Sequence, residues 1–247
     1  MTLKERLPKL LEMRRGHIAT LRSNAADPAK DRDGCSSSAV LLTLRFIGVA
    51  EFVVSGNVAV FRQCLSEAAR IKLSHFERRD AGDAIDDSYV AMLSYQGLFD
   101  ALAARDLATA EHLAQRMGGR PSVELKHDHP FDYCFGYALK AFVERRPDAM
   151  AEWSPRFSAT CSTAENADFV GYSMFLSAIL AGDAEMAREG LSAIAQGHKR
   201  QSKRGGVFKD TVDETLCVWG VGIANLGRRD GLPLKGLPPL IPQELLV

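Results

Sequence analysis

Three segments in the middle of the chain share one pattern: an apolar helical stretch, a short polar turn, and a second helical stretch with alanines on one face. The turns lie at residues 105–106, 146–147 and 182–183. Asp accepts hydrogen bonds from the free amides at a helix start, and Pro fits the first helical turn, so each turn predicts where a second helix begins. The predicted starts, each followed four residues later by an alanine, are Asp106 with Ala110, Pro147 with Ala151, and Asp183 with Ala187.

The fold class follows from this pattern. The predicted helix starts recur at intervals of about 40 residues, a period typical of helical-repeat proteins. We therefore expect an all-α protein built of stacked antiparallel helical hairpins, in a TPR-like or α-solenoid-like bundle. An α-protein without true repeats would also contain capped hairpins, so the pattern favours the hairpin architecture more strongly than it favours repetition.

The whole chain is expected to form a single all-helical domain over residues 1–247. Residues 1–80 are assigned to N-terminal helices and residues 86–197 to the hairpin repeats. Within the first part, an apolar helix is predicted over 38–54, and Asn57 is placed to cap a helix running from 58 to 79. The β-branched residues around the turn also allow a β-hairpin over 52–61, but apolar residues continue at helical spacing for several turns and favour helices.

The last fifty residues carry the most distinctive pattern. Residues 198–206 are basic and glycine-containing and predict a flexible linker, whereas residues 216–226 are apolar on every side and predict a helix at the centre of the domain. Gly220 and Gly222 each cost about 1 kcal/mol relative to Ala inside a helix, so close backbone contact with a neighbour is expected. Prolines and leucines from 232 to 246 predict an extended strap along the helical body.

Composition excludes several classes of function. Lys plus Arg equals Asp plus Glu, with 31 of each, so net charge gives no reason to expect nucleic acid as a partner. Five widely spaced cysteines fit reduced thiols in a cytoplasmic protein better than a disulfide framework. The apolar runs of about a dozen residues are shorter than a bilayer requires, so no membrane partner is expected.

Signatures of chemistry are absent from the sequence, which predicts a protein that is not an enzyme and uses no cofactor. The best metal candidate is the cluster of His127, His129 and Asp132. An imidazole pair of this kind could chelate a divalent ion, but no further ligand follows at a fixed spacing. Capping of a helix that starts near Pro130 is the favoured interpretation, and a metal enzyme is kept as a minor alternative.

Several of these segments resemble one known family. Residues 198–226 and 239–246 are similar to the ending of the immunity protein 49 family, and residues 60–70 and 180–183 are similar to earlier helices of that family. Members are bacterial proteins encoded beside polymorphic or contact-dependent toxins. The resemblance implies a helical cytoplasmic protein that binds and neutralises a cognate toxin, encoded by the adjacent gene, and it implies no catalytic residues.

Charged segments are the expected contacts with such a toxin, because charge complementarity provides specificity and fast association. Two clusters are predicted: a basic one, His198, Lys199, Arg200, Lys203 and Arg204, and an acidic one, Asp80, Asp83, Asp86 and Asp87. Plain exposure to solvent is the competing interpretation of both. The alternative function is a helical-repeat adaptor or chaperone that binds peptide segments of several partners in a concave groove.

Overall fold

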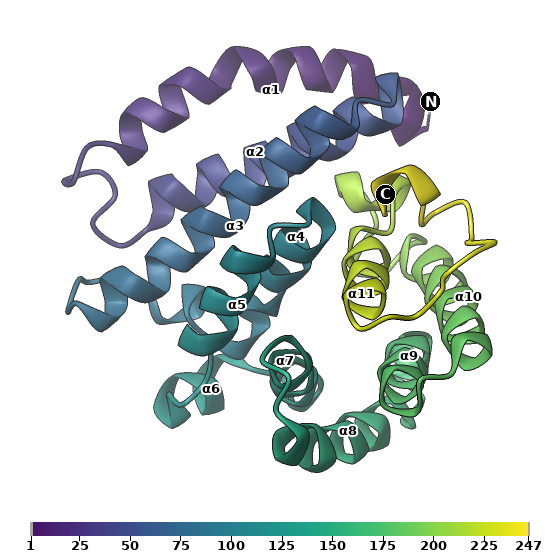
Figure 1. The fold of residues 1–247 in the computed structure, drawn as a ribbon. Helices are drawn as coiled ribbons and strands as arrows, with labels where there is room; N and C mark the ends of the chain where they lie inside the picture. The colour runs from purple at the N-terminus through teal and green to yellow at the C-terminus, as the bar shows by residue number, and fades with distance from the viewer. Residues whose placement is uncertain (1, 247) are drawn as a thin grey trace.

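The chain folds into helices joined by short turns, as seen in a computed structural model that describes residues 2–246 (Figure 1). No strand occurs in that span, which confirms the predicted all-α class. The α-helices are α1 (Leu3–Ala25), α2 (Cys35–Ser55), α3 (Val58–Asp80), α4 (Gln96–Ala104), α5 (Leu107–Arg116), α6 (Pro121–His127), α7 (Pro130–Val143), α8 (Pro147–Cys161), α9 (Val170–Ala181), α10 (Ala184–Gln201) and α11 (Val218–Arg229). Turns of 3₁₀ helix lie at Asp87–Tyr89, Met92–Tyr95, Ala167–Phe169, Val212–Thr215 and Gln243–Leu245.

Helices α1, α2 and α3 form an N-terminal layer in which α2 packs against both of the others. Gly56 ends α2 with a positive φ of 70°, and the Asn57 side chain accepts a hydrogen bond from the amide of Val60 at the start of α3. The predicted cap is therefore confirmed, and the alternative β-hairpin does not form. Helix α2 begins at Cys35, three residues before the predicted start.

Helix α2 is also the one helix, within residues 2–246, that is long and apolar enough to span a bilayer by length and composition. The expectation of shorter apolar runs did not anticipate it. In the folded chain, 61% of its most apolar window is buried, and the core helix of a folded domain passes the same test.

The three predicted hairpins are present as α4/α5, α7/α8 and α9/α10, and they share one backbone turn. Each first helix is followed by a residue with positive φ. The amide of the residue after it donates a hydrogen bond to a carbonyl five positions earlier, which satisfies a carbonyl that the helix end leaves free. The positive-φ residues are Arg105, Arg145 and Gly182, and the hydrogen bonds run from Asp106 to Ala101 at 2.9 Å, from Arg146 to Ala141 at 3.1 Å, and from Asp183 to Ala178 at 3.0 Å.

The second helices begin as expected. The carboxylate of Asp106 accepts from the amide of Thr109, and that of Asp183 accepts from the amides of Glu185 and Met186. Pro147 is the first residue of α8. The three predicted helix starts are thus confirmed, two by an aspartate cap and one by a proline in the first turn.

The alanine prediction holds for two hairpins and is wrong for the third. Ala110 and Ala187 are fully buried, but Ala151 is exposed. Helix α8 instead buries Phe157, whose ring stacks on that of Phe135 in α7 with centroids 4.4 Å apart. The middle hairpin is therefore held by aromatic side chains, which need a wider separation of the helices than alanines do.

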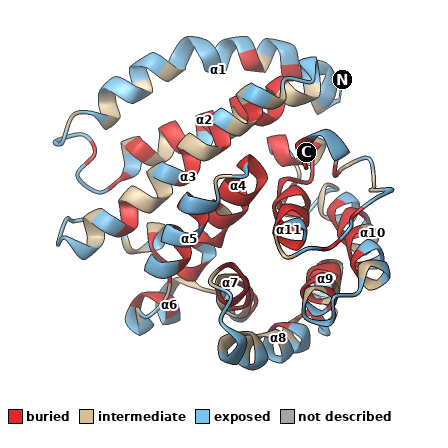
Figure 2. Ribbon diagram, viewed as in Figure 1, coloured by how far each residue is buried: buried red, intermediate tan, exposed pale blue. Residues whose placement is uncertain are grey.

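Helix α11 occupies the centre of the fold, as predicted. It lies between α4 on one side and α9 and α10 on the other (Figure 1), and all its residues from Val218 to Gly227 are buried (Figure 2). A Cβ on Gly222 would lie 2.9 Å from the backbone oxygen of Phe99, which explains the glycine. The Asn225 side-chain amide donates to the carbonyl of Leu102 at 3.0 Å.

The strap also lies where the prolines and leucines predicted. Its backbone is joined to the start of α11 by a hydrogen bond from the amide of Cys217 to the carbonyl of Leu240. Ile241, Leu245 and Leu246 are fully buried against the helices. A single 3₁₀ turn at Gln243–Leu245 interrupts the otherwise extended path.

The predicted linker over 198–206 is partly wrong. Helix α10 continues to Gln201, and His198 is buried with its ring stacked on Phe208 at a centroid distance of 4.3 Å. Cationic side chains in a last helical turn are stabilised by the negative end of the helix dipole, so the basic residues extend α10 instead of ending it. The remaining residues, 202–211, form turns.

Candidate functional site

The acidic cluster predicted as a contact surface is held within the chain. Asp80 is the last residue of α3 and pairs with Arg116 at 3.1 Å and with Arg120. The other three carboxylates are also engaged: Asp83 by Arg78 at 3.1 Å, Asp87 by Arg79 at 2.6 Å, and Asp86 by the amide of Ser88 at 2.9 Å. The arginines neutralise the charge of Asp80, Asp83 and Asp87, whereas the exposed Asp86 has only the neutral donors of Ser88.

The basic cluster is divided by the fold. His198 is buried, and its Nε2 atom lies 2.7 Å from the carbonyl oxygen of Asp213, so its side chain is not on the surface. Arg200 is exposed and pairs with Asp168. Three exposed cations, Lys199, Lys203 and Arg204, have no ion pair with any residue in the described span, and their role in binding stays a prediction. The ends of α3 and α10 lie on opposite sides of the molecule (Figure 1), so the two clusters do not form one surface.

The metal candidate does not assemble into a site. His129 caps α7, with its Nδ1 atom accepting from the amide of Phe131 at 3.3 Å. The carboxylate of Asp132 accepts from the hydroxyl of Tyr95 at 2.9 Å. Over residues 2–246, no group of three metal-ligating side chains lies within reach of one ion. The capping interpretation of His129 is confirmed.

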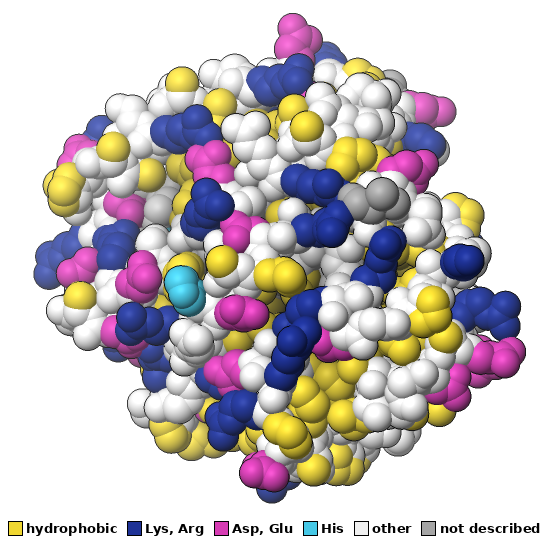
Figure 3. All heavy atoms as spheres, in the orientation of Figure 1, with side chains coloured by type: hydrophobic (Ala, Val, Ile, Leu, Met, Phe, Trp, Pro, Cys, Tyr) yellow, Lys and Arg dark blue, Asp and Glu magenta, His cyan; other side chains and the backbone are white. Residues whose placement is uncertain are grey.

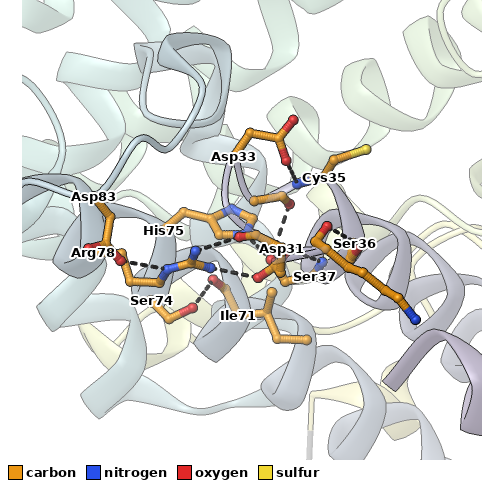
Figure 4. A network of polar contacts seen from close by, with 12 residues as sticks. Asp31, Asp33, Cys35, Ser36, Ser37, Ile71, Ser74, His75, Arg78 and Asp83 are labelled. Atoms are coloured by element: carbon orange, nitrogen blue, oxygen red, sulfur yellow. Dashed lines mark hydrogen bonds and ion pairs between the residues drawn. The ribbon is translucent and has the colours of Figure 1, made fainter. Parts of the chain in front are cut away.

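A serine–histidine pair occurs where the sequence showed only a serine run. In the network drawn in Figure 4, the Ser37 hydroxyl oxygen lies 2.7 Å from Nε2 of His75. The carboxylate of Asp31 accepts from the amide of Ser37 at 2.7 Å and from Arg78 at 2.6 Å. The pair therefore joins the start of α2 to α3, two elements that no local sequence pattern places together.

The hydrogen-bond pattern shows what this pair can do. The Ser37 hydroxyl also lies 3.1 Å from the carbonyl oxygen of Gly34, which can only accept. If the hydroxyl donates there, His75 must donate from Nε2 to Ser37, which leaves Nδ1 as an unpaired acceptor. His75 is fully buried, and burial lowers its pKa to about 4, with Lys72 acting in the same direction. In that arrangement the neutral ring is a structural tie, because a general base would need a free nitrogen at the serine.

A groove of about 1040 Å³ lies between the N-terminal layer and the C-terminal half. One wall comes from α1 and α2, and the other comes from the start of α7 and from residues 207–213. Aromatic rings of the central core line the groove between these walls: Tyr95, Phe131, Phe169, Phe208 and Trp219. A groove of this size and apolar character is the default binding site in a structure without a bound ligand.

A buried ion-pair network lies at the base of the groove. Arg45 of α2 donates to Asp100 of α4 at 2.7 Å, and its Nη2 atom lies 3.2 Å from the carboxylate of Asp213. Burial raises the pKa of Asp100 to about 6, although Arg45 acts in the opposite direction. The network ties the three elements that meet beneath the groove and fixes the relative position of its walls.

Exposed apolar side chains surround the groove. Leu42 is 63% exposed, Val207 is 61% exposed and Leu93 is 39% exposed, and all three line it. Leu42 belongs to α2, so part of the surface that makes this helix unusually apolar faces the groove. Clustered apolar exposure beside a cavity marks a site that a partner covers.

Sequence reasoning missed the groove because its walls are far apart in the chain. Residues of α1 face residues 207–213 across it, and no local pattern reports such a contact. The available signal is that residues 38–54 are apolar on most sides of the predicted helix, which by itself predicts burial and not a binding surface. Comparison of the chain with family models, with curated proteins and with solved structures finds no match.

Proposed function

We propose that this chain is an immunity protein that binds and neutralises a cognate bacterial toxin through protein–protein contacts made at the groove. The observation that carries the proposal is the set of exposed apolar side chains, Leu42, Leu93 and Val207, beside a floor of buried aromatic rings. The likeness of residues 198–246 to the immunity protein 49 family supplies the class of partner.

The dimensions of the groove favour a macromolecular partner. Its α1 wall runs from Leu3 to Leu21, which corresponds to about 27 Å of helix. A segment of a partner protein can cover that length, and apolar anchors in pockets are what concentrate binding energy in protein interfaces. The face of the molecule drawn in Figure 3 mixes both signs of charge, and the chain has equal numbers of acidic and basic residues. We therefore propose a protein partner in the cytoplasm, with neither nucleic acid nor membrane involved.

The alternative function, a repeat adaptor that binds peptides on a concave face, is less well supported. In repeat proteins of that kind the inner face of the hairpin array is open to ligands. Here α11 and the strap pack against the inner sides of α4, α9 and α10 and fill that space (Figure 1).

Co-expression with the toxin encoded by the neighbouring gene tests the proposal. Cells that carry the chain should survive the toxin, and the two proteins should co-purify as one tight complex. Cell death despite a well-expressed, folded chain would refute the function, and several partners of moderate affinity would favour the adaptor.

The groove is tested by a matched pair of variants. Leu42→Ser removes an exposed apolar anchor in the groove, whereas Leu125→Ser removes one that is 88% exposed on α6, outside it. We expect Leu42→Ser to weaken the complex about tenfold or more, as loss of a central interface anchor does, and Leu125→Ser to leave it unchanged. Equal effects of both substitutions would place the interface elsewhere.

A further inference from the structure

Helix α1 presents a mixed apolar and cationic face to the groove. Its buried residues, Leu7 and Leu11, pack against the protein, while a second stripe lines the groove. Leucines and arginines alternate along that stripe: Leu3, Arg6, Leu10, Arg14 and Leu21. The spacing of three to four residues keeps the first four on one side of the helix.

The two arginines of this stripe have no anionic partner. Arg6 and Arg14 are exposed and form no ion pair with any residue between 2 and 246. The guanidinium of Arg14 lies over the ring of Phe46, 5.5 Å from its centroid, which holds the charge against the groove wall. Most other arginines of the chain pair with carboxylates, so two arginines without such a partner in a single groove are unusual here.

Two of the three carboxylates on the other side of the groove already have a cationic partner: Asp213 lies beside Arg45, and Asp210 pairs with Lys209 at 3.0 Å. Asp132 accepts from the neutral hydroxyl of Tyr95 at 2.9 Å, a bond that leaves its charge uncompensated. The positive charge of the groove that lacks a partner is therefore located on α1. Its apolar surface is located on the exposed leucine of α2 and on residues 93 and 207.

We propose that the groove receives an acidic amphipathic helix of the partner protein, with two carboxylates on Arg6 and Arg14 and an apolar stripe on Leu42, Leu93 and Val207. The identity of the partner as a toxin rests on the proposed function; the chemistry of the bound segment does not. An apolar helix face in a groove is a recurrent mode of recognition.

The geometry of α1 sets the spacing of the partner's charges. Arg6 and Arg14 are eight residues apart, which is about 12 Å along a helix. A partner helix lying along α1 matches this distance with carboxylates seven or eight residues apart. A leucine midway between them would meet Leu10, which lies between the two arginines on α1.

Two synthetic peptides of about 18 residues test this recognition without any toxin. Both carry the same leucine stripe; one places Glu, and the other Lys, at two positions eight residues apart. We expect the acidic peptide to bind at least about tenfold more tightly in a fluorescence titration, because opposite charges at an interface favour the matched partner. The preference should weaken as salt is added.

Charge reversal on α1 provides the decisive comparison. The double variant R6E/R14E should invert the preference, so that the basic peptide binds more tightly. The control K4E/K9E changes the net charge equally on exposed residues of the same helix that do not line the groove, and should keep the original preference. Circular dichroism verifies that both variants fold.

Several results would overturn the proposal. These are equal affinity for both peptides, no binding of either one, or inversion by K4E/K9E as well. A concentration-dependent dimer that is abolished by Leu42→Ser would assign the groove to a second copy of the chain instead. If the peptides bind as expected but the neighbouring toxin does not, the groove chemistry stands and the proposed function fails. A toxin complex that forms but is indifferent to R6E/R14E would support the function and refute the groove chemistry.

Discussion

The guanidinium of Arg45 donates from Nε to the carboxylate of Asp100 across 2.7 Å, and both side chains are almost completely removed from water. The same guanidinium lies 3.2 Å from Asp213, so one cation holds two buried carboxylates from different elements. Because α2, α4 and the 3₁₀ turn at Val212–Thr215 meet at this point, the network sets the angle at which the N-terminal layer closes over the core.

Replacing the cation should therefore destabilise the whole fold. In Arg45→Met, Asp100 and Asp213 lose their countercharge while remaining buried, and we expect the free energy of unfolding to fall by about 3–5 kcal/mol in urea titrations. The control Arg70→Met breaks an ion pair with Asp106 in which the arginine is 67% exposed, and should cost less than about 1 kcal/mol. Similar losses in the two variants would contradict the structural role of Arg45.

The pH dependence of stability should carry a contribution from His75. Burial lowers its pKa from 6.5 to about 4 in the folded protein, so between those values the unfolded chain binds a proton that the folded chain does not. Stability due to this residue is thus complete above pH 6.5 and is lost as pH falls toward 4, by at most about 1.4 kcal/mol per pH unit.

His75→Gln tests that contribution, because the amide can still donate toward Ser37 but does not titrate. We expect unfolding curves collected from pH 4 to 7 to show a shallower loss of stability on acidification in the variant. Asp100, whose pKa is raised to about 6, has the opposite effect in both proteins and cancels in the difference. Parallel pH profiles would show that His75 does not titrate as its burial implies.

Two glycines in helices should respond to alanine in opposite ways. A Cβ on Gly222 would meet the backbone oxygen of Phe99 at 2.9 Å, and backbone atoms of a packed helix cannot move aside easily. We expect Gly222→Ala to destabilise the protein by about 1–3 kcal/mol. Gly16 lies inside α1 with nothing within 4 Å of an added Cβ, so Gly16→Ala should stabilise by about 0.5–1 kcal/mol. Thermal unfolding measures both, and a stabilised Gly222→Ala would disprove the close contact of α11 with α4.

One cysteine should react far faster than the others. Cys35 is exposed at the start of α2, whereas burial raises the pKa of Cys64 to about 11 and the pKa values of Cys161 and Cys217 to about 12. Burial also raises the pKa of the half-buried Cys134. Since the thiolate is the reactive form, native protein should show a single fast thiol with a chromogenic disulfide, and denatured protein should show five. Cys35→Ser should abolish the fast phase; a fast phase that persists would identify an opening of the core.

Local patterns explain which parts of the fold were predictable. A turn of two residues contains both the end of one helix and the cap of the next, so Asp106 and Asp183 each mark the helix start that they cap. The all-round apolarity of residues 216–226 likewise reports burial without reference to any neighbour. The prediction that Ala151 is buried failed because α7 and α8 are held together by the rings of Phe135 and Phe157. That packing is a property of two segments together.

The candidate site was largely hidden from sequence for the same reason. In the sequence Asp80 belongs to an acidic run and is predicted to be exposed, but in the fold it pairs with Arg116 and Arg120. His198 belongs to a basic run, but in the fold its ring stacks on Phe208. The groove is formed by α1 and by a segment that begins at residue 207. The sequence of neither segment indicates that it faces the other.

The hydrogen bond from Asn225 to Leu102 joins residues more than a hundred positions apart, and it has a consequence for synthesis. Helices α1 to α10 emerge from the ribosome before the helix that fills their centre. Contacts of such long sequence separation form late and slowly. Until α11 docks, the apolar inner sides of α4 and α9 are uncovered, so the nascent chain should depend on chaperones during that interval. Mutations that slow the docking of α11 should lower the yield of folded protein through aggregation before they lower its stability.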